Sequence, residues 1–351
     1  MATRRQRVWA PLRRIAIAAL AVTPACGFSL PEPFETDRGA YAEFVEFDAL
    51  ELELPTLVDT QTALVLGIRP DDVGTGALES LLLAARRHGV PVRAWLLLDD
   101  DDGYWPGEGN LEAYDRHVQA FWRWNRGGEL GVQWLQVDIE PPLPVSTELA
   151  AAVEAGNLAD ALPVLLANRD AEAFARSQRA WADAVAGWQH QGMKVAVVAL
   201  PYVLDDLGDG DTELQDLFDS PVSDIAWDEV GFMVYQNLFG TPAARLGPAL
   251  VASYAASAVE HFDDRAAIAL GTIGTIGKNT SSAGYDDRDA LQADVDAAAG
   301  VGVQRVQLLG IDGMRTRGGV SSWLDGLTAT ARMVEPSAEV DDARALIGLL
   351  D

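Results

Sequence analysis

Short apolar runs alternate with longer amphipathic stretches along most of this chain, and this alternation limits the fold more than any other feature. The runs have few polar interruptions, which is typical of strands that are buried on both faces. Between them, apolar residues recur with helical spacing. Strands joined by helices in this way predict a parallel sheet covered by helices. The strand runs are Thr62–Ile68, Val92–Leu98, Val132–Ile139, Lys194–Leu200, Glu229–Tyr235, Ala267–Ile273 and Arg305–Ile311, and the helical stretches are Gly76–His88, Leu111–Asn125, Ala171–Gln191, Ala243–Phe262 and Asp287–Ala299.

The number of repeating units favours a closed (β/α)8 barrel of the TIM type. Seven clear strands and a weaker one expected within Phe44–Leu54 make eight, with an irregular first unit, and 351 residues suit such a barrel. A doubly wound sheet is the competing architecture. We expect the barrel to occupy residues 41–335 and a C-terminal helix or tail, with a helix over Val340–Leu349, to occupy residues 336–351.

The N-terminus has the pattern of a bacterial export signal. Five arginines and no acid lie in the first 26 residues, and the apolar core Ile15–Val22 is too short to span a bilayer. Cys26, the only cysteine, follows a small residue, as in a lipoprotein cleavage site. The pattern predicts a signal peptide over 1–26, a lipid anchor on Cys26, a tether over 27–40 and a place in the cell envelope. Ordinary cleavage after Ala25 is the alternative.

Charge and histidine placement exclude several classes of function. The chain holds 53 acids against 26 Lys and Arg, a net charge of −27, which repels phosphate backbones and argues against nucleic-acid binding. All four histidines fall in helical stretches, which argues against a Ser-His-Asp triad and a histidine-based metal site. The acid-rich loop 205–213 lacks the ligand spacing of a calcium loop and is interpreted as solvated.

The strand Val132–Ile139 ends in two carboxylates and carries the strongest functional signal. Side chains alternate faces along a strand, so Trp134, Gln136, Asp138 and Glu140 share one face. Two prolines then end the strand. Acids two residues apart at a strand end can converge on one substrate atom, and an aromatic and an amide on the same face suggest a substrate-binding lining. This predicts a catalytic acid with a helper, as opposed to two solvated acids.

Other strand ends add aromatic and acidic residues to the same rim. In a barrel of this type the active site lies at the C-terminal ends of the strands. Tyr104 and Trp105 lie in an acid-rich loop after the second clear strand, Tyr202 follows the fourth, and Asp312 ends the last. Aromatic rings beside carboxylates suit sugar binding. The alternatives are that Tyr104 and Trp105 cap the barrel and that Asp312 caps a helix or turn.

The strand order and these residues resemble glycoside hydrolase family 18, the chitinase-like barrels. That family carries Asp-x-x-Asp-x-Asp-x-Glu on its fourth strand. Its last two positions match Asp138 and Glu140, whereas Gln133 and Gln136 replace the first two acids. The family's Met-x-Tyr-Asp on the sixth strand corresponds to Met-Val-Tyr-Gln at 233–236, again with an amide in place of the acid.

The resemblance implies substrate-assisted hydrolysis of a glycan that contains N-acetylhexosamine, without a metal or cofactor. Glu140 would protonate the glycosidic oxygen, Asp138 would orient the 2-acetamido group, and Tyr235 would hydrogen-bond that group. Met233 and Gln236 would line the substrate site.

Two other functions stay open. Family 25 lysozyme-like barrels also end a central strand in Asp-x-Glu and cleave peptidoglycan. A non-catalytic carbohydrate-binding lipoprotein on a decayed hydrolase barrel is the third candidate, because Gln133, Gln136 and Gln236 stand where acids are expected. The expected partners are a chitin-like or peptidoglycan-like glycan and, through Cys26, a membrane.

Overall fold

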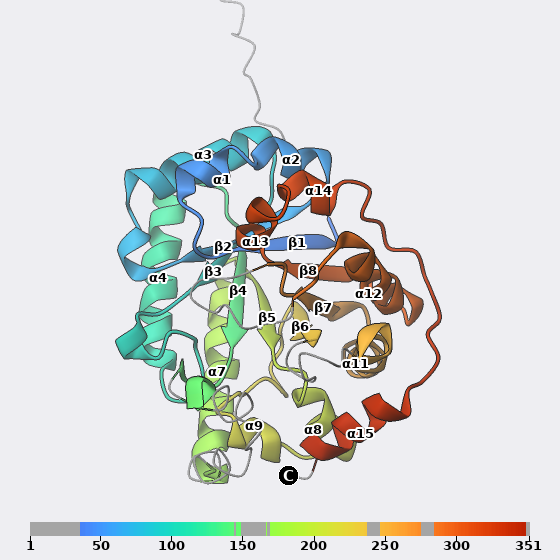
Figure 1. The fold of residues 1–351 in the computed structure, drawn as a ribbon. Helices are drawn as coiled ribbons and strands as arrows, with labels where there is room; N and C mark the ends of the chain where they lie inside the picture. Colours follow the sequence, from blue (N-terminus) through green and yellow to red (C-terminus); the bar gives the residue numbers. More distant parts are fainter. Residues whose placement is uncertain are drawn as a thin grey trace, which may run out of the picture. The chain divides into compact units, whose positions relative to one another are not determined.

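The chain forms a closed barrel of eight parallel strands that follow one another in chain order (Figure 1). The computed structural model describes residues 36–143, 145–148, 166, 169–236, 246–274 and 284–348, so the expected signal peptide and Cys26 lie outside the described residues. The predicted (β/α)8 barrel is therefore confirmed, and the alternative of a doubly wound open sheet is wrong. The strands are β1 Arg38–Ala42, β2 Ala63–Ile68, β3 Val92–Leu96, β4 Trp134–Ile139, β5 Lys194–Ala199, β6 Glu229–Met233, β7 Ala266–Gly271 and β8 Arg305–Leu309.

Helices cover the outside of this barrel and contact the outward side chains of the strands (Figure 1). The five helical stretches expected from the sequence are all present, as α3, α4, α7, α11 and α12. Several shorter helices lie after the strands. The helices are α1 Phe47–Glu51, α2 Leu54–Asp59, α3 Gly76–His88, α4 Leu111–Gly127, α7 Ala171–His190, α8 Val203–Asp209, α9 Glu213–Leu217, α11 Gly247–Phe262, α12 Arg288–Gly300, α13 Ile311–Thr316, α14 Val320–Leu324 and α15 Ala338–Ile347.

The first unit differs from the expectation. The segment Phe44–Leu54 forms no strand; it contains α1 and the start of α2, because Leu50, Leu54 and Leu57 are buried at helical spacing. The first strand instead begins at Arg38, within the expected tether, and closes the barrel by pairing with both β2 and β8. The expected boundary between residues 40 and 41 therefore lies inside a strand.

Two apolar clusters divide the core between the outside and the inside of the barrel. The larger one lies between the strands and the helices and contains the outward residues of β4, namely Leu135, Val137 and Ile139. The smaller one fills the upper part of the barrel interior and includes Tyr41, Trp95, Tyr104, Met233 and Tyr235. The predicted alternation of faces along β4 is therefore confirmed.

A polar network fills the barrel interior beneath the smaller cluster. Arg93 of β3 donates two hydrogen bonds to Glu229 of β6, at 2.6 and 2.9 Å. Gln307 of β8 donates to Glu229 at 2.7 Å and to Gln136 of β4 at 3.5 Å, and Tyr41 donates to Gln307. Side chains of five strands thus meet on the barrel axis, and the network supports the floor on which the carboxyl-end site rests.

The C-terminal helix α15 packs back onto the barrel's outer layer (Figure 1). Its Arg344 forms an ion pair with Asp205 of α8 at 2.6 Å and lies over the Tyr254 ring of α11 at 4.3 Å. The helix expected near Val340–Leu349 is thus confirmed within two residues. In the part of the chain that the structure describes, no helix combines the length and the apolarity that crossing a bilayer requires.

Candidate active site

Asp138 and Glu140 lie at the carboxyl end of β4 and at the top of the barrel interior. Asp138 is inside the strand and only 3% exposed, whereas Glu140 follows the strand and is less completely buried as a residue. The loop after β3 approaches this strand end closely, since a Cβ on Gly107 would lie 3.4 Å from the carbonyl oxygen of Glu140. A buried carboxyl beside a less completely buried one is an arrangement that can separate their chemical roles.

The surroundings raise the pKa of both acids. Burial, followed by the charge of Glu43, raises the pKa of Glu140 to about 8. Burial, followed by the charges of Glu140 and Glu43, raises the pKa of Asp138 well above its usual range, and the neighbouring Trp95 indole lowers it by less. Glu140 therefore stays protonated near neutral pH. Among the described residues, Asp138 Oδ1 is buried and has no hydrogen-bond partner, which marks it as an acceptor that the protein itself leaves unused.

Tyr235, which the sequence resemblance groups with these acids, lies near them in the barrel interior. It lies in the interior cluster with Met233. Burial is the main cause that raises the pKa of Tyr235, and the charges of Asp138, Glu140 and Glu43 add to the rise. Room for its ring depends on Gly271 of β7, because a Cβ there would lie 3.0 Å from Tyr235 Cε1. Met233 is buried in the same cluster and forms part of the site's floor.

Glu43 is the acid that sequence reasoning missed. It follows β1 and takes part in the same electrostatic cluster as Asp138 and Glu140. Tyr104 donates its hydroxyl to Glu43 Oε1, and Arg69 donates to the Tyr104 hydroxyl at 3.3 Å. Burial raises the pKa of Glu43 to about 7, although the Tyr104 hydrogen bond opposes the rise. The correct position of β1 would have placed Glu43 on the inward face, two residues after Tyr41.

Asp312 and Tyr202 lie at the rim but bind protein groups. Asp312 accepts hydrogen bonds from the backbone N–H groups of Glu43 at 3.1 Å and Phe44 at 2.7 Å, so it fixes the loop after β1. Tyr202 stacks on Phe218 with ring centroids 4.3 Å apart, and its hydroxyl pairs with Ser220 at 3.0 Å. Asp312 thus makes the contacts of a turn cap, whereas Tyr202 contacts Phe218 and Ser220.

Tyr104 and Trp105 are held edge to face with ring centroids 4.9 Å apart. Arg69 lies over the Tyr104 ring at 5.0 Å, and Tyr104 is almost fully buried. Trp105 is only partly buried and packs against the interior cluster. Of this pair, Trp105 therefore has the surface to contact a sugar, whereas Tyr104 acts on Glu43.

Three other residues expected to line the site lie elsewhere. Trp134 begins β4 at the opposite end of the barrel, between Arg93 at 4.5 Å and Lys194 at 5.3 Å. Gln136 is completely buried in the interior network. Gln236 turns away from the interior, with its amide nitrogen bonded to the Gly247 carbonyl and Asp294 and its oxygen accepting from the Gly247 N–H. Trp134 and Gln136 share a strand face with the acids but lie further from the carboxyl end of the strand. Gln236 belongs to the motif of the sixth strand, but its side chain binds groups outside the barrel interior.

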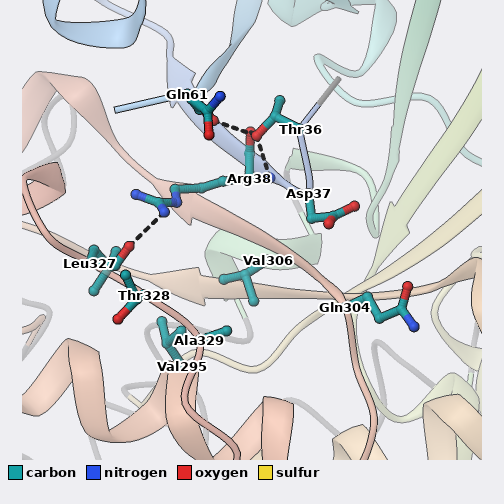
Figure 2. Close-up of a pocket in the computed structure, with 10 residues that line it drawn as sticks. All are labelled: Thr36, Asp37, Arg38, Gln61, Val295, Gln304, Val306, Leu327, Thr328 and Ala329. Carbon is teal, nitrogen blue, oxygen red and sulfur yellow. Dashed lines mark hydrogen bonds between the residues drawn. The ribbon is translucent and has the colours of Figure 1, made fainter. Parts of the chain in front are cut away.

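Two further features lie apart from these acids. The carboxylates of Asp206, Asp209 and Asp211 come within 4.8 Å of one another, but Asp206 already accepts hydrogen bonds from Leu214 and Gln215. A pocket of about 320 Å³ lies at the amino ends of β1 and β8, where Arg38 donates to the Leu327 carbonyl (Figure 2). That pocket contains none of the candidate site residues. It is lined by Thr36, Asp37, Arg38, Gln61, Val295, Gln304, Val306, Leu327, Thr328 and Ala329.

Comparison with known proteins places the chain by fold alone. No protein family matches the sequence, and no curated protein matches it. The PgaB glycoside hydrolase domain from Bordetella bronchiseptica has a similar structure, with 14% identity, a TM-score of 0.51, and coverage of 85% of this chain and 100% of that domain. A D-allulose 3-epimerase from Methylomonas sp. aligns with 9% identity and a TM-score of 0.44 over 92% of this chain and 98% of its own.

Proposed function

We propose that this protein is a glycoside hydrolase that cleaves a glycan containing N-acetylhexosamine, with Glu140 as the general acid and Asp138 as its helper. The observation that carries the proposal is the pair itself. Two carboxyls lie side by side at the carboxyl end of β4, where Glu140 has a pKa raised to about 8 by burial and by Glu43. A carboxyl that is protonated at neutral pH is what glycosidic-bond cleavage requires.

The reaction proceeds in two steps through the substrate's own acetamido group. Glu140 gives its proton to the glycosidic oxygen while the bond from that oxygen to the anomeric carbon breaks. The acetamido carbonyl oxygen bonds to the anomeric carbon, and Asp138 and Tyr235 hold the acetamido group in place. Water then attacks the anomeric carbon, the oxygen–carbon bond of the intermediate breaks, and the water's proton returns to the Glu140 carboxylate.

Other features support a sugar as the substrate. Trp105 is partly exposed and packs against the interior cluster that contains Tyr235, and Asp138 Oδ1 is an acceptor without a partner among the described residues. The barrel shared with the PgaB glycoside hydrolase domain is compatible with this chemistry. Gln136, which stands where the chitinase-like family has an acid, is bound by Gln307 in the interior network.

The test is hydrolysis of defined glycans. The wild-type protein is incubated with N-acetylglucosamine oligomers and with peptidoglycan fragments, and products are separated by chromatography. Release of shorter oligosaccharides supports the proposal, and preference for N-acetylated over N-deacetylated oligomers supports the substrate-assisted step. If the protein binds these glycans without cleaving them, the proposed hydrolase activity is contradicted and the alternative of a carbohydrate-binding lipoprotein is favoured.

We also propose that the protein is exported and anchored to a bacterial membrane through a lipid on Cys26. The support is the basic segment, the short apolar core and the placement of the only cysteine, all of which are sequence features. Labelling cells with radioactive palmitate tests it. Label that disappears in Cys26→Ala supports the anchor, and label that survives the substitution contradicts it.

A further inference from the structure

Glu43 is held by side chains from three different parts of the barrel. Its carboxylate accepts the Tyr104 hydroxyl from the loop after β3, and Arg69 from the end of β2 donates to that hydroxyl. Its backbone N–H is bound by Asp312 from α13, after β8. Contacts of this kind fix both the side chain and the backbone, and the tyrosine hydroxyl and the arginine both favour the ionised carboxylate.

The position of Glu43 places its charge at the catalytic pair. Tyr41, two residues earlier on the same strand, points into the barrel interior, and strand alternation directs Glu43 the same way. Asp138, Glu140 and Tyr235 all respond electrostatically to Glu43. Between the two glutamates the asymmetry is clear: Glu43 has the hydrogen-bond donors, so it ionises first, and its charge then opposes ionisation of Glu140.

We propose that Glu43 is a positioning residue that keeps Glu140 in its acid form through the charge that Tyr104, Arg69 and Asp312 fix at the mouth of the barrel. This inference rests on the proposed function only where it names Glu140 as the general acid. Glu43 needs no contact with the substrate for this role. It acts because its negative charge disfavours the second negative charge that Glu140 would gain on ionising in a buried site.

Other titratable and charged groups interact with the two glutamates, and the experiment must leave them unchanged. The cation among them is Arg69, and it acts on Glu43 partly through Tyr104. The rest are tyrosines and two aspartates. By element they are Tyr41 of β1, Arg69 after β2, Tyr104 after β3, Asp138 of β4, Tyr202 after β5, Tyr235 after β6 and Asp312 of α13.

The test is a direct titration of Glu140 that needs no substrate. The full protein is labelled with ¹³C at the glutamate side-chain carboxyls, and the Glu140 resonance is assigned by its loss in Glu140→Gln. Titration is compared in wild type, Glu43→Gln, Glu43→Asp and Glu112→Gln. The last removes a charge from an exposed position on α4, where the side chain is 93% exposed. The amide oxygen that Glu43→Gln introduces can still accept the Tyr104 hydrogen bond, so the substitution preserves the fold.

We expect Glu140 to titrate near pH 8 in the wild type and at least about one pH unit lower in Glu43→Gln. Glu43→Asp should restore most of the difference, and Glu112→Gln should change nothing. An unchanged titration in Glu43→Gln, or an equal shift in Glu112→Gln, would overturn the inference. If the wild type cleaves no glycan, the proposed function fails, but the titration still decides the role of Glu43.

Discussion

Arg93 and Glu229 form an ion pair inside the barrel that should determine much of its stability. Glu229 is 1% exposed and accepts two hydrogen bonds from Arg93, at 2.6 and 2.9 Å. Arg93→Met leaves a buried carboxylate with Gln307 at 2.7 Å and with Arg305, which is 3.5 Å away and about one-third exposed. Breaking a buried pair from one side costs about 3–5 kcal/mol, and because Arg305 compensates in part we expect about 3 kcal/mol.

Urea unfolding at pH 7, followed by far-ultraviolet circular dichroism and linear extrapolation, measures this loss. The matched control is the double variant Arg93→Met/Glu229→Gln. It leaves no buried charge on the axis and keeps an oxygen that can accept from Gln307, so it should be more stable than Arg93→Met alone. A single variant that loses less than about 1 kcal/mol, or a double variant that is no more stable than the single one, would refute the reasoning.

Three further predictions test other parts of the structure. Gly271→Ala should push the Tyr235 ring, cost about 1–3 kcal/mol in urea unfolding and lower hydrolysis, whereas Gly187→Ala, where a Cβ meets nothing within 4 Å, should not destabilise α7. The pKa of Glu140 is raised in the folded protein, so the native protein binds more protons than the unfolded protein between about pH 4.5 and 8. The urea concentration at the unfolding midpoint should therefore fall as pH rises through that window, and it should fall less steeply in Glu140→Gln. Asp170→Ala removes the acceptor for two N–H groups at the start of α7 and should cost about 1 kcal/mol in the same assay.

The strands that form the barrel were predictable because they are short, mostly apolar runs with few polar interruptions. Strands β2 to β8 and the main helices follow from that pattern and from helical spacing. The first strand was not predictable, because Arg38–Ala42 consists largely of small residues and contains no β-branched residue. The acids and apolar residues of Phe44–Leu54 alternate like a strand, but Leu50, Leu54 and Leu57 pack as one helical face.

The residues of the candidate site that lie on a single strand were predictable from the sequence. Residues that reach the site through contacts between several strands were not. Asp138 and Glu140 follow from the alternation along β4. Trp134 shares their face but lies at the other end of the strand, since a two-residue period defines a face and says nothing about depth. Glu43 owes its place to hydrogen bonds with residues 61 and 269 positions away, which no local pattern reveals.

Glycan hydrolysis by wild type and Glu140→Gln, measured as kcat/KM across pH 5 to 9, tests the central claim most directly. A glutamine has nearly the same shape as glutamate but cannot give a proton to the glycosidic oxygen. We predict that the wild type loses activity as pH rises above about 8, where Glu140 ionises, and that Glu140→Gln loses about 10²–10⁴-fold at every pH. A Glu140→Gln protein that cleaves the same glycan at the wild-type rate would contradict the account.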